Sequence, residues 1–210
     1  VREDPDYDKL RTMRGAAQRG RDLVQQILTF SRKVETKTRP VDLNHELRQT
    51  ELLLRRTIEK TISIEMDLAD NLWPISADPI HIEQILLNLA VNAKHAMPQG
   101  GRLMIETKNI KLDEEYCRTH LKTSPGSYVL LTVSDSGHGM DKAVVERIFE
   151  PFFTTKETGE GTGLGLAMVF GLVKSHDGHV SCYSEPGVGT TFKIYFPAIE
   201  KELECSAETT

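Results

Sequence analysis

Cysteine is scarce in this sequence, with three among 210 residues: Cys117, Cys182 and Cys205. Their spacing forms neither the paired set of a disulfide framework nor a C-x-x-C metal motif. We therefore expect all three to be structural or incidental, in a protein of the reducing cytoplasm.

Long hydrophobic runs are also missing. The longest apolar stretches, such as "YVLLTV" and "LGLAMVFGLV", fall well short of the roughly 20 residues that a membrane span needs, and no signal peptide opens the chain. The sequence begins with Val1 rather than Met. We therefore expect a piece of a longer protein, which reaches a membrane only through segments upstream of this one.

An excess of positive charge is absent as well. The 26 lysine and arginine residues face 31 aspartate and glutamate residues, and the formal net charge is -5. Nucleic-acid binding draws most of its affinity from a basic surface. The charge balance therefore argues against a nucleic-acid partner.

One amphipathic pattern occupies the first part of the chain, residues 1–38. Small or apolar residues recur there at alternating spacings of four and three, at Ala16, Gly20, Leu23, Ile27, Phe30 and Val34. This period predicts one long helix. Its stripe has to be buried against a second helix, supplied by another chain or by an upstream segment. The turn-forming stretch "ETKTRPVD" then marks a boundary near residues 35–42.

Helical and strand-like patterns alternate over residues 39–199. The predicted helices are 43–57, 79–97, 141–148 and 163–176. The predicted strands are 62–68, 102–110, 127–134, 179–184 and 190–196, with an irregular insertion at 112–126. The strands are rich in β-branched and aromatic residues, and their short connections favour antiparallel neighbours. We predict an α+β fold, a two-layer sandwich whose mixed sheet carries helices on one face, followed by a polar tail or linker at 200–210.

Two asparagines stand four residues apart in "NLAVNAKHAMPQGG", a strongly helical segment. At this spacing Asn88 and Asn92 project from the same face of a helix. An amide oxygen is a hard, neutral ligand that suits Mg²⁺, which keeps phosphates and waters as its other ligands. Taken alone, the same pattern is typical of an ordinary polar helix face.

The segment "DSGHGM" follows the apolar stretch "VLLTV". Gly137 and Gly139 let the backbone turn sharply and approach a ligand closely. The carboxylate of Asp135 can accept a hydrogen bond from the exocyclic amine of adenine, a position where guanine has a carbonyl. A hairpin turn without any ligand has the same composition.

Two further segments are rich in glycine. In "GTGLGLAMVFG" three glycines precede an apolar helix, whose N-terminus offers unpaired N–H groups to a phosphate. The run "FFTTKETGEGTG" has the composition of a mobile lid, in which Lys156 can reach a phosphate. The glycine spacing is not the G-x-G-x-x-G of a dinucleotide fold, and no P-loop motif occurs.

In this order, "LNLAVNA", "DSGHGM", "FEPFFTTK" and "GTGLGLA" resemble the N, G1, F and G2 boxes of the sensor histidine kinase ATP-binding domain. The resemblance covers about residues 40–197 and is closest to the subgroup with many hybrid kinases, in which the second dimerisation helix ends like "LVQQILTFSR". It implies the Bergerat form of the α/β sandwich, which gyrase, Hsp90 and MutL share. It also implies a kinase that uses ATP and Mg²⁺ to phosphorylate a histidine.

The resemblance further implies roles for individual residues. Asn92 would coordinate Mg²⁺, Asp135 would recognise adenine, and Lys156 would act on the phosphates. Asn88 stands where gyrase-like relatives keep a catalytic glutamate, and would order the phosphate end. The absence of that base favours transfer to histidine over hydrolysis.

Other positions of the nucleotide pocket follow from the same boxes. Many kinases of this family have a lysine or arginine three residues after the metal-binding asparagine. Here that place is His95, preceded by Lys94, and the sequence leaves open which of the two helps to bind phosphate. The remaining implied pocket residues are Gly137, Gly139, Phe149, Gly161, Thr162, Gly163, Leu164, Gly165 and Thr190.

The segment "NHELRQ" around His45 looks like the box that carries a phospho-accepting histidine. The proline of that box is missing, and too few residues separate His45 from Asn88 to hold two bundle helices and the start of an ATP domain. We therefore predict that residues 43–57 are the first helix of the ATP domain, capped by Asp42 or Asn44. The acceptor histidine is expected on a helix upstream of Val1.

The sequence thus predicts three parts: half of a dimerisation hairpin at 1–38, an ATP-binding catalytic domain at 39–199, and the tail at 200–210. The expected partners are ATP, the dimerisation helices of a homodimer and the receiver domain of a response regulator. Two other classes stay open, a gyrase-like or chaperone-like ATPase and a non-enzymatic binding module. Turnover of ATP without an acceptor would indicate the first, and failure to bind Mg-ATP the second.

Overall fold

The computed structural model describes residue 10, residue 13 and residues 37–115, 124–156 and 161–199. Outside these ranges lie the tail expected at 200–210, part of the insertion expected at 112–126, and nearly all of the long helix expected before residue 35. Over the described ranges, no helix is long and apolar enough to cross a membrane.

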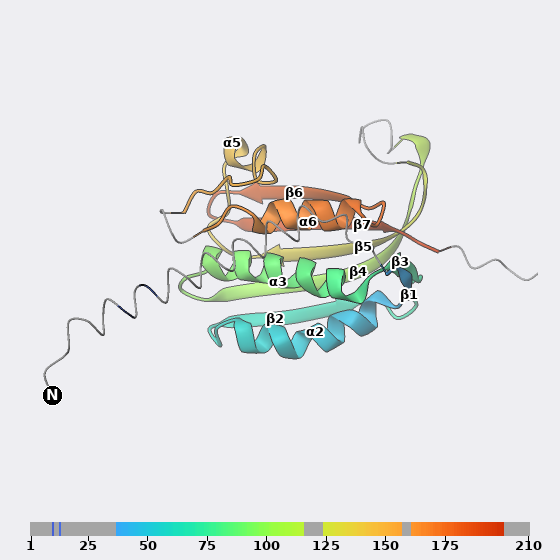
Figure 1. The fold of residues 1–210 in the computed structure, drawn as a ribbon, viewed down its shortest axis with the longest axis horizontal. Coiled ribbons are helices and arrows are strands. Elements are labelled where there is room, and N and C mark those ends of the chain that lie inside the picture. The colour runs from blue at the N-terminus through green and yellow to red at the C-terminus, as the bar shows by residue number, and fades with distance from the viewer. Residues whose placement is uncertain (1–9, 11–12, 14–36, 116–123, 157–160, 200–210) are drawn as a thin grey trace, which may run out of the picture.

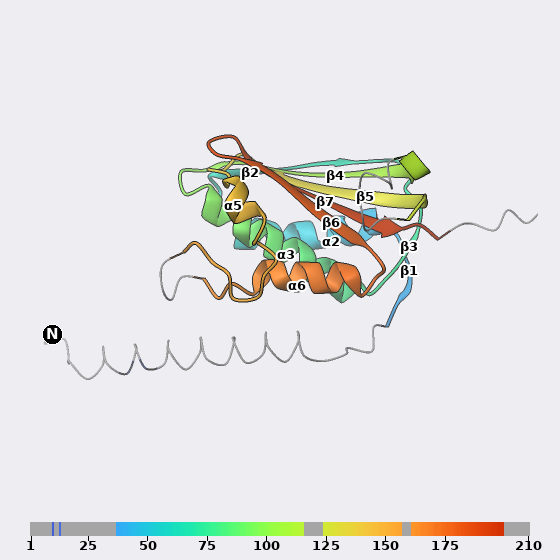
Figure 2. The same ribbon diagram turned by 90° about the horizontal axis from the view of Figure 1, so that it is seen from above.

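A mixed sheet forms one layer of the molecule and helices form the other (Figures 1 and 2). The sheet order is β2-β4-β5-β7-β6, and its strands are β2 (Ile62–Leu68), β4 (Gly101–Leu112), β5 (Gly126–Asp135), β6 (His179–Glu185) and β7 (Gly189–Pro197). Only β2 and β4 pair in parallel among these neighbours, and the other three pairs are antiparallel. The long helices are α2 (Leu43–Thr57), α3 (Pro79–Ala96) and α6 (Gly165–Lys174), with a short α5 (Lys142–Val145). Figure 2 shows the three long helices on one face of the sheet, which confirms the predicted two-layer fold.

The two N-terminal helices of this layer begin at aspartate caps. The Asp42 side chain accepts hydrogen bonds from the backbone N–H groups of Asn44 and His45, and Asp78 accepts from Ile80 at the start of α3. Each cap satisfies donors that a helix end leaves unpaired. The predicted boundaries of α2 are confirmed, and His45 lies in its first turn, on an exposed surface.

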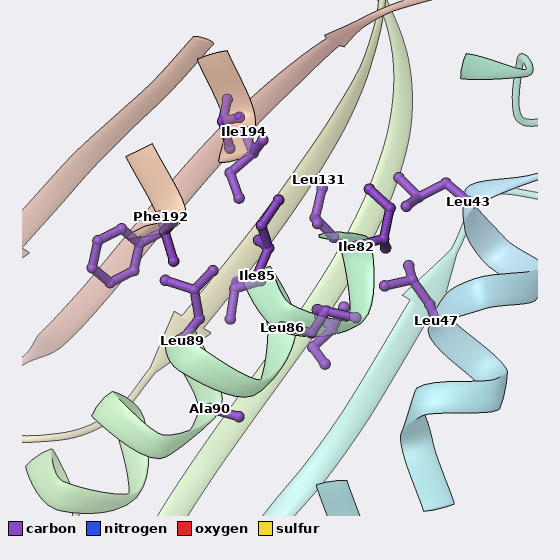
Figure 3. Close-up of a cluster of buried hydrophobic side chains, with 14 of the residues drawn as sticks. Leu43, Leu47, Ile82, Ile85, Leu86, Leu89, Ala90, Leu131, Phe192 and Ile194 are labelled. Atoms are coloured by element: carbon purple, nitrogen blue, oxygen red, sulfur yellow. The ribbon is translucent and has the colours of Figure 1, made fainter. Parts of the chain in front are cut away.

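The core lies between the sheet and α3, which is flanked by α2 and α6 (Figure 3). One face of α3 is apolar at the spacing of a helix packed on a sheet. The fully buried side chains of this cluster include Leu43, Leu47, Ile82, Ile85, Leu86, Leu89, Leu131 and Ile194. Because this face is fixed against the core, the rotation of α3 about its axis is fixed as well.

Two short strands were not predicted from the sequence. β1 (Arg39–Val41) pairs antiparallel with β3 (Ile75–Ala77) in a separate two-stranded sheet. Pro40 and the neighbouring turn formers made this stretch look like a simple boundary, because proline is unfavourable inside most strands. The helix expected at 163–176 is also shorter, since it begins only at Gly165.

A pair of histidines is buried where α3 begins and α6 ends. His81 Nδ1 and His176 Nε2 lie 3.1 Å apart, and each residue is 5% exposed. Burial lowers the pKa of both rings; the charge of His81 lowers that of His176 further, whereas Asp78 raises both and Asp177 raises that of His176. His176 Nδ1 has no hydrogen-bond partner, so protonation there would bury an unpaired charge.

We predict that the free energy of unfolding decreases as the pH falls below about 6.5, the ordinary histidine value. Because the pKa is lowered in the folded state, the unfolded chain takes up protons first as the pH falls. The stabilisation that the neutral histidines provide is therefore complete above the unfolded-state pKa, and it is lost as the pH falls toward the folded-state pKa. Urea unfolding at pH 7.5 and 5.5 measures the loss. His176→Gln should make the loss of stability between these two pH values smaller. His45→Gln, which changes an exposed residue, should leave that loss unchanged. An equal loss in wild type and His176→Gln would contradict this account.

Candidate functional site

Three polar side chains line the C-terminal half of α3 beside its apolar face. Asn88, Asn92 and His95 follow one another at intervals of four and three residues, which places them along one side of the helix. The start of α6 lies directly against the first two. A methyl group on Gly165 would lie 3.2 Å from Asn88 Oδ1 and 3.9 Å from Asn92 Nδ2. The absence of a side chain at Gly165 therefore leaves both amides open to the N-terminus of α6.

That N-terminus carries no side-chain cap. Leu164 occupies the cap position, and among the residues that the structure describes no side chain caps this helix start. Thr162 is exposed, and its hydroxyl accepts only a 3.4 Å bond from the Leu164 N–H. A helix start of this kind attracts an anion through its free N–H groups and its dipole.

The amide of Asn92 has capacity that the protein does not use. Its Nδ2 is buried and has no hydrogen-bond partner in the part of the chain that the structure describes, whereas Asn88 Nδ2 donates to the backbone carbonyl of Gln84 at 2.8 Å. A buried amide without a partner is costly and calls for a ligand. No group of three or more histidine, cysteine, aspartate or glutamate side chains in the described ranges could hold a metal ion.

His95, rather than Lys94, faces Lys156. Lys156 Nζ and His95 Nδ1 lie 2.8 Å apart, so the ring nitrogen accepts from the ammonium group. Lys94 points to the other side of α3, where its Nζ lies 3.2 Å from Glu59 Oε1. The structure therefore separates the two neighbours that the sequence left open, and brings only His95 to Lys156.

Asp135 is the last residue of β5 and belongs to a second part of the site, apart from the start of α6. Its Oδ1 accepts from the Gly137 N–H at 2.9 Å, and its strand partner is Thr190 on β7. Burial raises the pKa of this carboxyl, while the backbone N–H groups of Gly137 and Thr190 and the nearby His138 lower it. A half-buried acceptor of this kind lies where a hydrogen-bond donor of a ligand can pair with it.

The loop after Asp135 is clamped between α3 and the β6–β7 hairpin. The His138 N–H donates to the carbonyl of Ala96, the last residue of α3, at 3.0 Å. A methyl group on Gly137 would lie 2.6 Å from Ala96 Cβ, and one on Gly139 would lie 2.0 Å from the Glu185 carbonyl oxygen. These glycines are needed because other parts of the backbone come close to them.

Glycines also join the two ends of the expected lid. The Phe152 N–H donates to the Gly163 carbonyl at 3.0 Å, and Gly163 has φ +65°, with no room for a side chain beside Phe152. Gly161 packs against Thr154 and Lys156. Residues 157–160, which connect Lys156 to Gly161, lie outside the part of the chain that the structure describes.

Two further predicted residues, Leu164 and Phe149, are apolar and at least partly buried. Leu164 is 3% exposed. Phe149 is partly buried, and its ring lies 5.6 Å from Phe170 and 6.5 Å from Phe192. Cys182 is partly buried near Asp135, and burial together with that charge raises the pKa of its thiol to about 12. The thiol is therefore protonated, which fits the structural role expected for this cysteine.

One polar group of the site was missed from the sequence. Ser184 Oγ accepts from the Met140 N–H at 2.8 Å, and it lies 3.0 Å from Thr190 Oγ1. No motif marks Ser184. Its position follows from the pairing register of β6 with β7, which opposes Ser184 to Thr190, and a sequence alone does not give this register.

The fold and the site together define a nucleotide-binding α/β sandwich, and comparisons with known proteins agree. Residues 77–200, more than half of the chain, match the family model described as histidine kinase-, DNA gyrase B-, and HSP90-like ATPase. The chain therefore belongs to this family.

Relatives and solved structures are consistent with that family. Sensor kinase CckA of Brucella abortus is 42% identical over 200 residues, which are 95% of this chain and 21% of CckA. Full-length ShkA, solved in complex with AMPPNP, superposes with a TM-score of 0.74 at 27% identity, over 95% of this chain and 40% of ShkA. Histidine kinase ThkA in complex with response regulator TrrA shares the fold, with a TM-score of 0.70 at 23% identity, over 94% of this chain and 53% of that one. The chain spans about a fifth of the length of CckA.

Two glycines of this site provide a matched test of the clamp. Gly139 and Gly187 both have positive φ, +66° and +79°, but only Gly139 has backbone atoms within contact distance of an added methyl group. We predict that Gly187→Ala lowers the free energy of unfolding by about 1 kcal/mol, the cost of the left-handed conformation. Gly139→Ala should cost about 3 kcal/mol or more, because strain and overlap add. Equal losses in urea unfolding would show that the hairpin does not clamp the loop.

Proposed function

We propose that this chain is the catalytic part of a sensor histidine kinase, which binds Mg-ATP and transfers its γ-phosphoryl group to a histidine. The observation that carries the proposal is the arrangement along α3. At one point of this helix, two amides meet the uncapped start of α6. At its end, Ala96 accepts a hydrogen bond from the loop that follows the half-buried Asp135.

The end with Asp135 fits an adenine base. A carboxylate that already accepts from Gly137 keeps acceptor capacity for a further donor, and the exocyclic amine of adenine supplies one. A guanine carbonyl at the same place would meet only acceptors. We assign Gly137, Gly139, Phe149 and Thr190 to the same base pocket.

The end with α6 fits phosphates. The free N–H groups of α6 and the Lys156 ammonium can bind phosphate oxygens. We assign Gly161, Thr162, Gly163, Leu164 and Gly165 to this segment. His95 orients Lys156, whereas Lys94 contributes positive charge from farther away.

Asn92 is the residue that would hold Mg²⁺. Its Nδ2 is buried and has no hydrogen-bond partner among the described residues. Because the two ends of an amide have nearly the same shape, a rotation of the amide by half a turn would place Oδ1 at that position as a ligand for the cation. When bound, Mg²⁺ would neutralise charge that develops on the transferred phosphoryl group. Asn88, which takes the place of a carboxylate base, orders the phosphate end and cannot activate a water molecule for hydrolysis.

The acceptor is not His45 in this proposal. The first turn of α2 is held at the far end of β2, where Asn44 Nδ2 donates to the Ala69 carbonyl. The Asp135 end of the site adjoins Leu103, near the beginning of β4. Figure 1 shows the start of α2 and the C-terminal end of α3 at opposite ends of the helical layer. Phosphoryl transfer needs a nucleophile in line with the γ-phosphate, which a mobile helix outside this domain can provide.

The names of two similar proteins support the partners that we propose for this chain. CckA is named a sensor kinase, and ThkA was solved with a response regulator. We propose that residues 1–38 pair in a homodimeric helix bundle, that residues 39–199 form the ATP-binding domain, that residues 200–210 act as a linker, and that phosphate passes to the receiver domain of a response regulator.

The adenine role predicts the behaviour of Asp135→Asn. The new amide presents a donor where acceptors are useful, so calorimetry should show affinity for Mg-ADP reduced about tenfold or more. Asp141→Asn is the matched control, because Asp141 caps α5 in the same loop and asparagine caps a helix equally well. Asp141→Asn should bind like wild type. Equal affinity of Asp135→Asn and wild type would remove Asp135 from the base pocket.

The acceptor role predicts a labelling pattern. We predict that this chain does not label itself from γ-labelled ATP, because His45 lies at the end of the helical layer opposite the C-terminal end of α3 (Figure 1) and the proposed acceptor is on another helix. A longer chain with an upstream acceptor helix should form an acid-labile, base-stable phosphohistidine on that helix, and His45→Gln should label normally. If His45→Gln abolished labelling while Mg-ADP affinity was intact, His45 would be the acceptor.

A further inference from the structure

Ser184 on β6 connects three parts of the site through one hydroxyl group. Its Oγ lies 2.8 Å from the Met140 backbone nitrogen, 2.9 Å from the Gly189 carbonyl oxygen and 3.0 Å from Thr190 Oγ1. Met140 belongs to the loop after Asp135, and the other two residues begin β7. Ser184 therefore links the loop to the strand beside Asp135.

The directions of these bonds follow from counting protons. A carbonyl only accepts and a backbone N–H only donates. The single proton of Ser184 is donated to the Gly189 carbonyl, and its oxygen accepts from Met140. The bond to Thr190 therefore has Thr190 as donor. With its proton used in this way, the Thr190 hydroxyl can act toward a ligand only as an acceptor.

Thr190 lies beside the base-recognising carboxylate. Asp135, Thr190 and Ser184 are direct partners across β5, β7 and β6, and residues paired in this way point to the same face of a sheet. Residues of the same parity on β5 and β7, such as Val133 and Phe192, belong to the core under the helices. The row of three thus emerges on the helix-covered face, where the site lies.

We propose that Ser184 is a positioning residue that holds the Thr190 hydroxyl as an acceptor and so sets the preference for adenine over guanine. This inference rests on the proposed function. With Ser184 in place, Asp135 and Thr190 both offer acceptors, which an exocyclic amine satisfies and a carbonyl does not. Without Ser184, the Thr190 hydroxyl can rotate and donate to a guanine carbonyl.

The test compares the affinities of Mg-ADP and Mg-GDP by calorimetry in variants whose folding is checked by thermal unfolding. Ser184→Ala should lower the ratio of ADP to GDP affinity about tenfold, because one directed hydrogen bond is worth about that factor. Ser184→Thr, which keeps the hydroxyl, should restore the ratio. Ser134→Ala is the matched control, since Ser134 Oγ lies 3.0 Å from Thr191 Oγ1 in a cross-strand hydroxyl pair one residue away. It should leave the ratio unchanged.

The outcomes separate this inference from the proposed function. If wild type binds neither nucleotide, the proposed function fails. If wild type prefers ADP and Ser184→Ala loses affinity for both nucleotides equally, Ser184 is merely structural and the inference is overturned. If Ser184→Ala does not fold, Thr190→Val replaces it in the test. A lower ratio of ADP to GDP affinity in Thr190→Val supports the inference, and an unchanged ratio contradicts it.

Discussion

The close contact between the start of α6 and α3 is the constraint on which the site depends. Gly165 lies so near Asn88 that a methyl group would be 3.2 Å from its amide oxygen. The apolar face of α3 packs on the sheet, which fixes where Asn88, Asn92 and His95 point. Burial of the core thus orients the polar groups, and the small size of glycine brings the N–H groups of α6 to them.

A second constraint acts at the far end of the site, through the β6–β7 hairpin. Gly139 packs so close to the Glu185 carbonyl that it has no room for a side chain. The Gly187 N–H donates to the His138 carbonyl, and Ser184 Oγ accepts from the Met140 N–H. The loop proposed to recognise the base is therefore held by backbone contacts as well as by Asp135. In the proposed function, a base pocket held in this way would keep the nucleotide in place while the acceptor helix approaches.

Most of this fold was predictable because its elements have strong local signals. The aspartate cap and apolar spacing of α2 defined its limits, and strands such as β2 stood out by their β-branched residues. β1 and β3 were missed since three-residue strands form only through tertiary pairing. The boxes predicted Asn92 and Asp135 as site residues. The separate environments of Lys94 and His95 and the position of Ser184 were not predictable, because they depend on helix rotation and strand register.

The most direct measurement compares Mg-ADP affinity in Gly165→Ala and Gly171→Ala by calorimetry. Both glycines lie in α6, but a methyl group on Gly171 has nothing within 4 Å, and alanine favours a helix at either position. The account predicts wild-type affinity for Gly171→Ala and a loss of about tenfold or more for Gly165→Ala, with folding intact. Equal affinities in the two variants would contradict a phosphate site between α3 and α6.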